Sequence, residues 1–115
     1  MKKVEHSSTY RVGTGDIRLE VTIGEGQFGS TRATVGAKQL DDVHDMNQLI
    51  GKGSELAGQV LTVRSVVTDT NLQTNRTSVT YRLTGGPAPL EQTLSLTVEE
   101  ESDSVDYKAV FQLVS

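Results

Sequence analysis

Residues 59–84 read QVLTVRSVVTDTNLQTNRTSVTYRLT, and the alternation in this stretch decides the fold class. Apolar side chains recur at every second position on one face of each half: Leu61, Val63 and Val67, then Val79, Tyr81 and Leu83. Alternation with many β-branched residues is typical of half-buried strands. Pairing Val67 with Val79 keeps both apolar rows on one face and leaves a turn around Leu72–Thr74. The pattern therefore predicts a β-hairpin over this stretch.

The residues near the N-terminus repeat this pattern. Segments 8–12 and 17–23 both alternate, and the intervening Gly13–Asp16 is rich in turn-forming residues. A hairpin with Tyr10 opposite Leu19 places the apolar residues of both strands on one face.

The C-terminal third predicts a further hairpin. Segments 92–98 and 105–113 alternate, and the acidic loop 99–104 separates them. The prolines in 85–89 end the preceding strand, because proline cannot donate to a strand ladder. Residues 27–37 have a weaker pattern interrupted by glycine, which favours a bulge or an irregular edge strand.

Residues 39–58 are the one long segment without a strand pattern. Their apolar residues recur at three-to-four spacing: Val43, Met46, Leu49 and Ile50. This spacing predicts two or three helical turns, which glycines at 51 and 53 end. A connection of this length is either a crossover between sheets or a functional loop.

The whole pattern predicts an all-β fold, an antiparallel two-sheet sandwich of about seven strands that is immunoglobulin-like in general architecture. A barrel is the alternative. Residues 1–115 are expected to form one domain, with 1–7 frayed and 39–58 as a partly helical crossover.

Composition narrows the function classes. Eleven Lys and Arg against fifteen Asp and Glu give a net charge of −4, which argues against a nucleic-acid-binding protein. The chain has no cysteine, so disulfides and thiolate chemistry are excluded. The first residues lack the apolar core of a signal peptide, and no apolar run approaches the ~18 residues of a membrane span. We therefore expect a soluble domain, and the sequence does not indicate its compartment or oligomeric state.

Two acidic clusters are candidate metal sites. Asp41, Asp42, His44 and Asp45 form the densest group of ionisable side chains, but their spacing matches no established ligand signature. Residues 99–106 lack the alternating ligands and central glycine of a calcium loop. We expect no metal ligands, no cofactor and no catalytic residues.

These observations favour a non-catalytic binding or interaction module with a protein partner. The displayed residues Phe28, Asp41, Asp42, His44 and Asp45 are the predicted binding surface. Few aromatic residues are present to stack on sugars, which disfavours a carbohydrate ligand. Two alternatives remain: a small hydrolase or metal-dependent enzyme that uses residues 41–45, and a structural subunit that assembles through an exposed strand edge.

Overall fold

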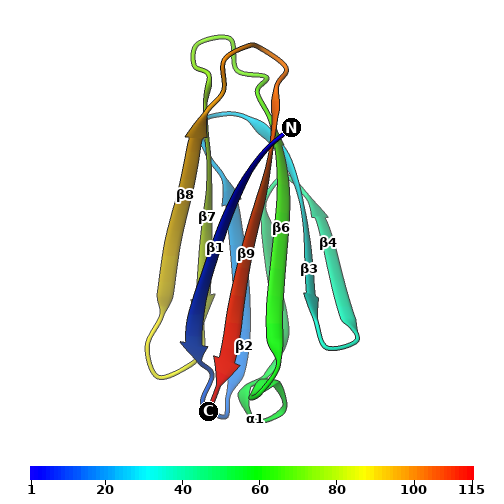
Figure 1. Cartoon of the computed structure of the whole chain (residues 1–115). Helices are drawn as coiled ribbons and strands as arrows, with labels where there is room; N and C mark the ends of the chain where they lie inside the picture. Colours follow the sequence, from blue (N-terminus) through cyan, green and yellow to red (C-terminus); the bar gives the residue numbers. More distant parts are fainter.

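The computed structural model describes residues 1–115 as two packed β-sheets (Figure 1). The five-stranded sheet has the order β1-β9-β6-β3-β4, and the four-stranded sheet has the order β5-β2-β7-β8. The elements are β1 (Lys2–Arg11), β2 (Asp16–Ile23), β3 (Phe28–Val35), β4 (Lys38–Val43), β5 (Met46–Lys52), α1 (Gly53–Leu56), β6 (Val60–Thr68), β7 (Arg76–Thr84), β8 (Leu90–Thr97) and β9 (Ser104–Val114). The predicted packing of two β-sheets is confirmed, but the sheets contain nine strands where about seven were predicted, and they do not close into a barrel.

The three predicted hairpins are wrong. β6 and β7 lie in different sheets, as do β1 and β2, and β8 and β9. Of the consecutive strands, only β3–β4 and β7–β8 are paired neighbours. The N-terminal strand β1 instead runs parallel to β9. Because both sheets face one core, Val67 and Val79 both point inward without being neighbours in a ladder.

Residues 39–58 do cross between the sheets, since β4 lies in the five-stranded sheet and β5 in the four-stranded one, but the helix predicted within this segment is wrong. Residues 38–52 form β4 and β5, and the only helical turn is α1, which begins at Gly53, one of the two glycines predicted to end the helix. The three-to-four spacing of apolar residues does not mark the buried face of a helix. Of the four side chains, Met46 and Ile50 are buried, while Val43 and Leu49 are exposed. The pairing of β2 with β5 shifts register between Ile17 and Arg18, and this shift disturbs the alternation of inward and outward side chains in β5.

The observed strand pairing corrects two further predictions. Residues 2–7, expected to be frayed, pair in continuous register with β9. The strand near Phe28, expected at an edge, lies between β4 and β6 and has no bulge in either ladder. Its inward row is Gly29, Thr31, Ala33 and Val35, whose small or polar members hide the apolar pattern.

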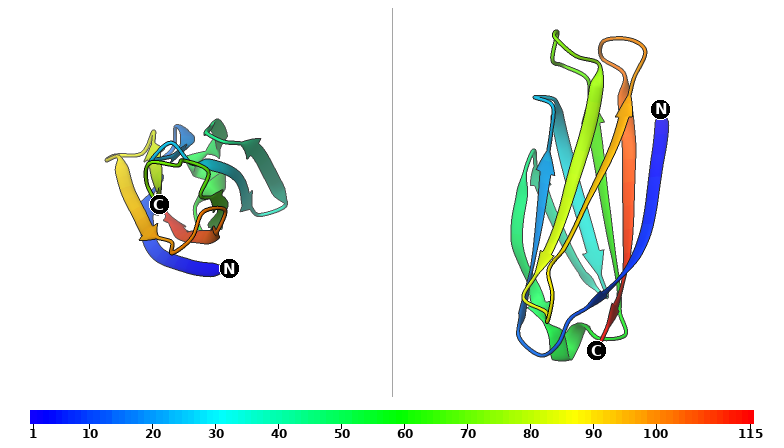
Figure 2. Two further views of the ribbon diagram at one scale, coloured as in Figure 1. Left: turned by 90° about the horizontal axis from the view of Figure 1, so that it is seen from above. Right: turned by 90° about the vertical axis from the view of Figure 1, so that its left-hand side faces the viewer.

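The core is a single cluster of 23 buried residues from both sheets. The inward positions predicted for 59–84 are confirmed, since Val63, Val67, Val79, Tyr81 and Leu83 are all fully buried. Across the core, the rings of Tyr81 and Phe111 meet edge to face, with centroids 6.3 Å apart. At one end of the molecule, α1 closes the core with Leu56, while the loops after β6 and β8 project at the other (Figure 2). The structure contains no helix long and apolar enough to span a membrane.

Two buried tyrosines differ in how their hydroxyls are satisfied. Thr77 Oγ1 donates to the Leu96 carbonyl at 2.7 Å, so the Tyr107 hydroxyl donates to Thr77 Oγ1 at 2.6 Å. The Tyr81 hydroxyl is buried without a hydrogen bond of good geometry, and burial raises the pKa of Tyr81, an effect that the neighbouring Ser65 hydroxyl partly offsets. The adjacent Ser65 forms its hydrogen bond with Thr31 at 2.7 Å.

This difference predicts opposite effects for the same substitution. Tyr107→Phe should lower the free energy of unfolding by about 0.5–1.5 kcal/mol, because a hydrogen bond is lost. Tyr81→Phe should leave it unchanged or raise it by up to about 1 kcal/mol, because an unsatisfied polar atom is removed. Urea denaturation of both variants measures the difference. A larger loss for Tyr81→Phe than for Tyr107→Phe would contradict the hydrogen bonding described here.

Candidate functional site

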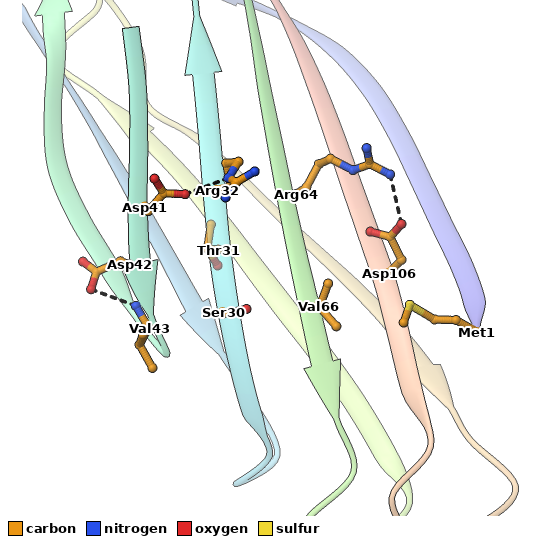
Figure 3. A pocket seen from close by; sticks show the side chains of 10 residues that line it. All are labelled: Met1, Ser30, Thr31, Arg32, Asp41, Asp42, Val43, Arg64, Val66 and Asp106. Atoms are coloured by element: carbon orange, nitrogen blue, oxygen red, sulfur yellow. Dashed lines mark hydrogen bonds and ion pairs between the residues drawn. The ribbon is translucent and has the colours of Figure 1, made fainter.

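A broad surface hollow lies on the outer face of the five-stranded sheet, the face turned away from the other sheet. It has a volume of about 860 Å³ and lies over β4, β3, β6 and β9 (Figure 3). The residues that line it are Met1, Ser30, Thr31, Arg32, Asp41, Asp42, Val43, Arg64, Val66 and Asp106. Apart from Thr31 and Asp42, the strand residues in this set have outward positions, because side chains alternate along each strand.

One end of the hollow is apolar. Ser30 on β3 lies opposite Val43 on β4 and Val66 on β6, so a small side chain separates two valines about 10 Å apart. Phe28 lies two residues before Ser30 and points to the same side of the sheet. Val43 is 66% exposed, Phe28 52% and Val66 38%. We call Phe28, Ser30, Val43 and Val66 the Ser30 patch.

The other end is charged and ordered by two ion pairs. Arg32 Nε donates to Asp41 Oδ1 at 2.8 Å across the β3–β4 ladder. Arg64 Nη2 donates to Asp106 Oδ2 at 3.0 Å, and the Asp106 side chain is only 13% exposed. The hydrogen bond from Arg32 lowers the pKa of Asp41, so this carboxylate remains ionised below its ordinary range. These ion pairs orient the two guanidinium groups beside the Ser30 patch.

Cations outnumber anions on this face, although the whole chain carries a net charge of −4. The outward cations are Lys3, Arg11, Arg32, Arg64 and Lys108, and the outward anions are Glu5, Asp41 and Asp106. Acidic residues concentrate instead in the loop Glu99–Asp103. The outer face therefore combines an apolar patch with an excess of positive charge around it.

The predicted site residues separate into two groups. The outer face brings together Phe28 and Asp41, whereas Asp42 points from the opposite face of β4 and accepts a hydrogen bond from the Val43 N–H at 3.0 Å. His44 occupies the tight turn after β4 with φ +67°, and its N–H donates to the Gly29 carbonyl. Asp45 Oδ1 accepts a hydrogen bond from the Ile23 N–H at 2.9 Å. Residues 41–45 thus do not converge on one point, and no three His, Asp or Glu side chains form a metal-binding group.

The sequence interpretation missed Arg32, Arg64, Val66 and Asp106. Alternation already placed Arg64 outward, but an outward arginine is ordinarily part of a solvated face. What makes it part of a site is the neighbouring strand, because Asp106 comes from β9, 42 positions later in the chain. Only the pairing of β6 with β9 brings these side chains together.

A second hollow of about 550 Å³ lies where the β7–β8 loop approaches β1. It is lined by Tyr10, Arg11 and the segment 87–91, and Tyr10 Oη accepts a hydrogen bond from the Gly86 N–H at 2.9 Å. It has neither a titratable cluster nor an exposed apolar group comparable to the Ser30 patch.

Comparison with known proteins finds no matching family model, no matching curated protein and no matching solved structure.

Proposed function

We propose that this protein is a non-catalytic binding module that recognises a protein partner through the outer face of its five-stranded sheet. The observation that supports this most strongly is the arrangement around Ser30. Exposed apolar side chains lie together at one end of an open hollow, and two arginine–aspartate pairs lie beside them. Protein interfaces commonly have this anatomy, an apolar centre with a polar rim in which arginine is enriched.

The chemistry of the face favours a partner with acidic groups around an apolar contact. Arg32 and Arg64 each retain exposed guanidinium surface, with side chains 65% and 53% exposed. Each guanidinium has five N–H donors, and its aspartate uses only part of this set. Carboxylates of the partner are the matching acceptors, because arginine binds them in bidentate geometry.

The other ligand classes have less support. Phe28 is the only aromatic residue of the Ser30 patch, so a stacking platform for sugar rings is missing. An enzyme would need its acid, base or metal ligands in one place, and residues 41–45 point in different directions.

Assembly through a strand edge is a second candidate because β4 borders the hollow. β4 is the last strand of its sheet, so one side of its backbone has no partner strand. A strand added there would extend the sheet beside Val43 and Asp41. An immunoglobulin-like relationship likewise stays a proposal, supported by the two-sheet architecture alone.

Paired valine substitutions test the proposed surface. Val43→Thr combined with Val66→Thr keeps the β-branched shape while removing apolar contact. Recovery of the native partner from an extract of the source cells should fall at least about tenfold, which corresponds to ~1.4 kcal/mol of binding energy. Quantitative pull-down followed by titration of the identified partner measures this loss.

The same face provides a matched control. Val60 and Val114 are also exposed outward valines, 39% and 38% exposed, at the other end of the five-stranded sheet. Val60→Thr with Val114→Thr should leave partner recovery and melting temperature unchanged. Equal losses in the two double variants, or no loss in the first, would overturn the assignment of the Ser30 patch.

A further inference from the structure

A buried carboxylate without a counterion lies at the loop end of the sandwich. Asp69 directly follows β6 and is 0% exposed. Its Oδ1 atom is buried and has no hydrogen-bond partner. Buried carboxylates are normally paired with a cation or fully hydrogen-bonded, because loss of hydration is costly. The Oδ1 atom of Asp69 is therefore an exception to this pattern.

A second acid and an amide meet Asp69 at this point. One terminal atom of the Asn75 side-chain amide lies 2.8 Å from Asp69 Oδ2 and 3.2 Å from Glu101 Oε1. With nitrogen in that place, Asn75 donates one hydrogen bond to each carboxylate. Without a cation this orientation is the favoured one, because an oxygen in that place would face only acceptors while the amide nitrogen would face only donors. We call these three residues the Asp69 cluster.

No cationic side chain pairs with either carboxylate. No Lys, Arg or His nitrogen lies within 4.0 Å of a carboxylate oxygen of Asp69 or Glu101. The ion pair that involves the acidic loop joins Lys2 of β1 to Glu99 at 3.8 Å and does not include Glu101. The carboxylate of Asp103 is not part of this group, and its Oδ2 accepts a hydrogen bond from the Glu100 N–H at 3.3 Å.

Backbone hydrogen bonds hold the three residues of the cluster together. The Asp69 N–H donates to the Asp103 carbonyl and the Ser102 N–H donates to the Asp69 carbonyl, both at 2.9 Å. The Val98 N–H donates to the Asn75 carbonyl at 2.9 Å. The loop that carries Glu101 is thereby fixed against both ends of the loop that carries Asp69 and Asn75 (Figure 1).

The intervening turn is also held from inside the protein. Gln27 is 1% exposed and forms four hydrogen bonds with residues 70–76. Its Oε1 accepts from the N–H groups of Thr70 and Asn71 at 2.8 Å each. Its Nε2 donates to the carbonyls of Thr74 and Arg76 at 3.1 and 3.0 Å. The positions of Asp69 and Asn75 are therefore set in advance of any ligand.

We propose that the Asp69 cluster is a calcium site formed by Asp69, the Asn75 amide oxygen and Glu101, with water completing the coordination. Carboxylate and amide oxygens are the ligands of hard cations, and Ca²⁺ accepts irregular geometry where Mg²⁺ demands an octahedron. Zinc prefers nitrogen and sulfur ligands, and neither is present here. One divalent cation neutralises the two carboxylates, and the Asn75 amide turns its nitrogen toward them when the ion leaves.

Sequence spacing did not indicate this site because its ligands come from two loops. Asp69 and Asn75 flank the β6–β7 turn, and Glu101 belongs to the acidic loop before β9. With two charged ligands and one amide, we expect a weak site with a dissociation constant of about 10⁻⁴ M, similar to extracellular calcium modules.

A melting experiment on the full chain tests the proposal. At about 10 mM CaCl₂, roughly 100 times the expected dissociation constant, the melting temperature should rise by about 10 °C relative to EDTA. An equal concentration of MgCl₂ controls for ionic strength and should produce a much smaller rise. Asp69→Asn should abolish the calcium response while melting no lower than the unaltered protein in EDTA, since it removes an uncompensated buried charge.

Variants within the acidic loop separate the site from general charge effects. Glu101→Gln should weaken the calcium response, whereas Glu100→Gln, one residue away, should retain it. In Asn75 a bound ion should also shift the side-chain amide signals in a ¹⁵N NMR spectrum. An unaltered protein whose melting temperature is the same in calcium, magnesium and EDTA would overturn the proposal. So would an Asp69→Asn variant, shown to be folded, that keeps the full response.

Discussion

Phe111→Ala is expected to lower the free energy of unfolding by about 3–5 kcal/mol, as for other buried phenylalanines. Phe111 is fully buried on β9, and its ring meets Tyr81 of β7 at an interplanar angle of 63°. This contact joins the two sheets, so the substitution removes aromatic packing and leaves a cavity between them. Urea denaturation monitored by circular dichroism measures the loss.

The next residue along the strand is the control. Gln112 points outward from β9, and Gln112→Ala should change stability by no more than about 0.5 kcal/mol. A loss below ~1 kcal/mol for Phe111→Ala, or similar losses for both variants, would mean that β9 does not present Phe111 to the opposite sheet.

Gly85→Ala is expected to cost more than about 2 kcal/mol, through strain and collision together. Gly85 follows β7 with φ +106°, a conformation that side chains disfavour. A Cβ atom there would collide with the backbone carbonyl oxygen of Asp16 at the start of β2. Since that contact is backbone, it has little freedom to move aside, and thermal or urea unfolding should record a clear loss.

Gly58→Ala separates the two causes. Gly58 also has a positive φ, +88°, but no atom lies within 4 Å of the position that its Cβ would occupy. The Gly58→Ala variant should therefore lose about 1 kcal/mol of unfolding free energy, through conformational strain alone. A Gly85→Ala variant no less stable than Gly58→Ala would contradict the close approach of the β7–β8 loop to β2.

The sequence predicted which side chains face inward but not which strands are neighbours. Alternation follows from burial on one side of a strand, and it is a local property visible in Val79, Tyr81 and Leu83. Pairing depends on the other strand, and two sheets around one core offer partners that satisfy the same inward row. Val67, predicted opposite Val79, therefore lies opposite Gly29 and Val105.

The same limit applies to the candidate sites. Phe28 and Asp41 were predicted to be displayed, and they do lie on the outer face of the five-stranded sheet. His44 and Asp45 were included because they are close in sequence, but the turn at His44 directs them elsewhere. Arg64 could not be assigned to a site from the sequence, because its partner Asp106 becomes adjacent only when β6 pairs with β9.

Position-specific photo-crosslinking tests the proposed binding surface most directly. Ser30 lies at the centre of the Ser30 patch, and Ser95 is an exposed outward serine on β8 of the other sheet. A photoreactive benzoyl-phenylalanine would replace each serine in turn, and the tagged protein would be irradiated in an extract of the source cells. The binding proposal predicts one discrete crosslinked partner at Ser30, competed by unmodified protein but not by the Val43→Thr, Val66→Thr variant, and none at Ser95. The same partner crosslinked equally at both positions, or at Ser95 alone, would contradict it.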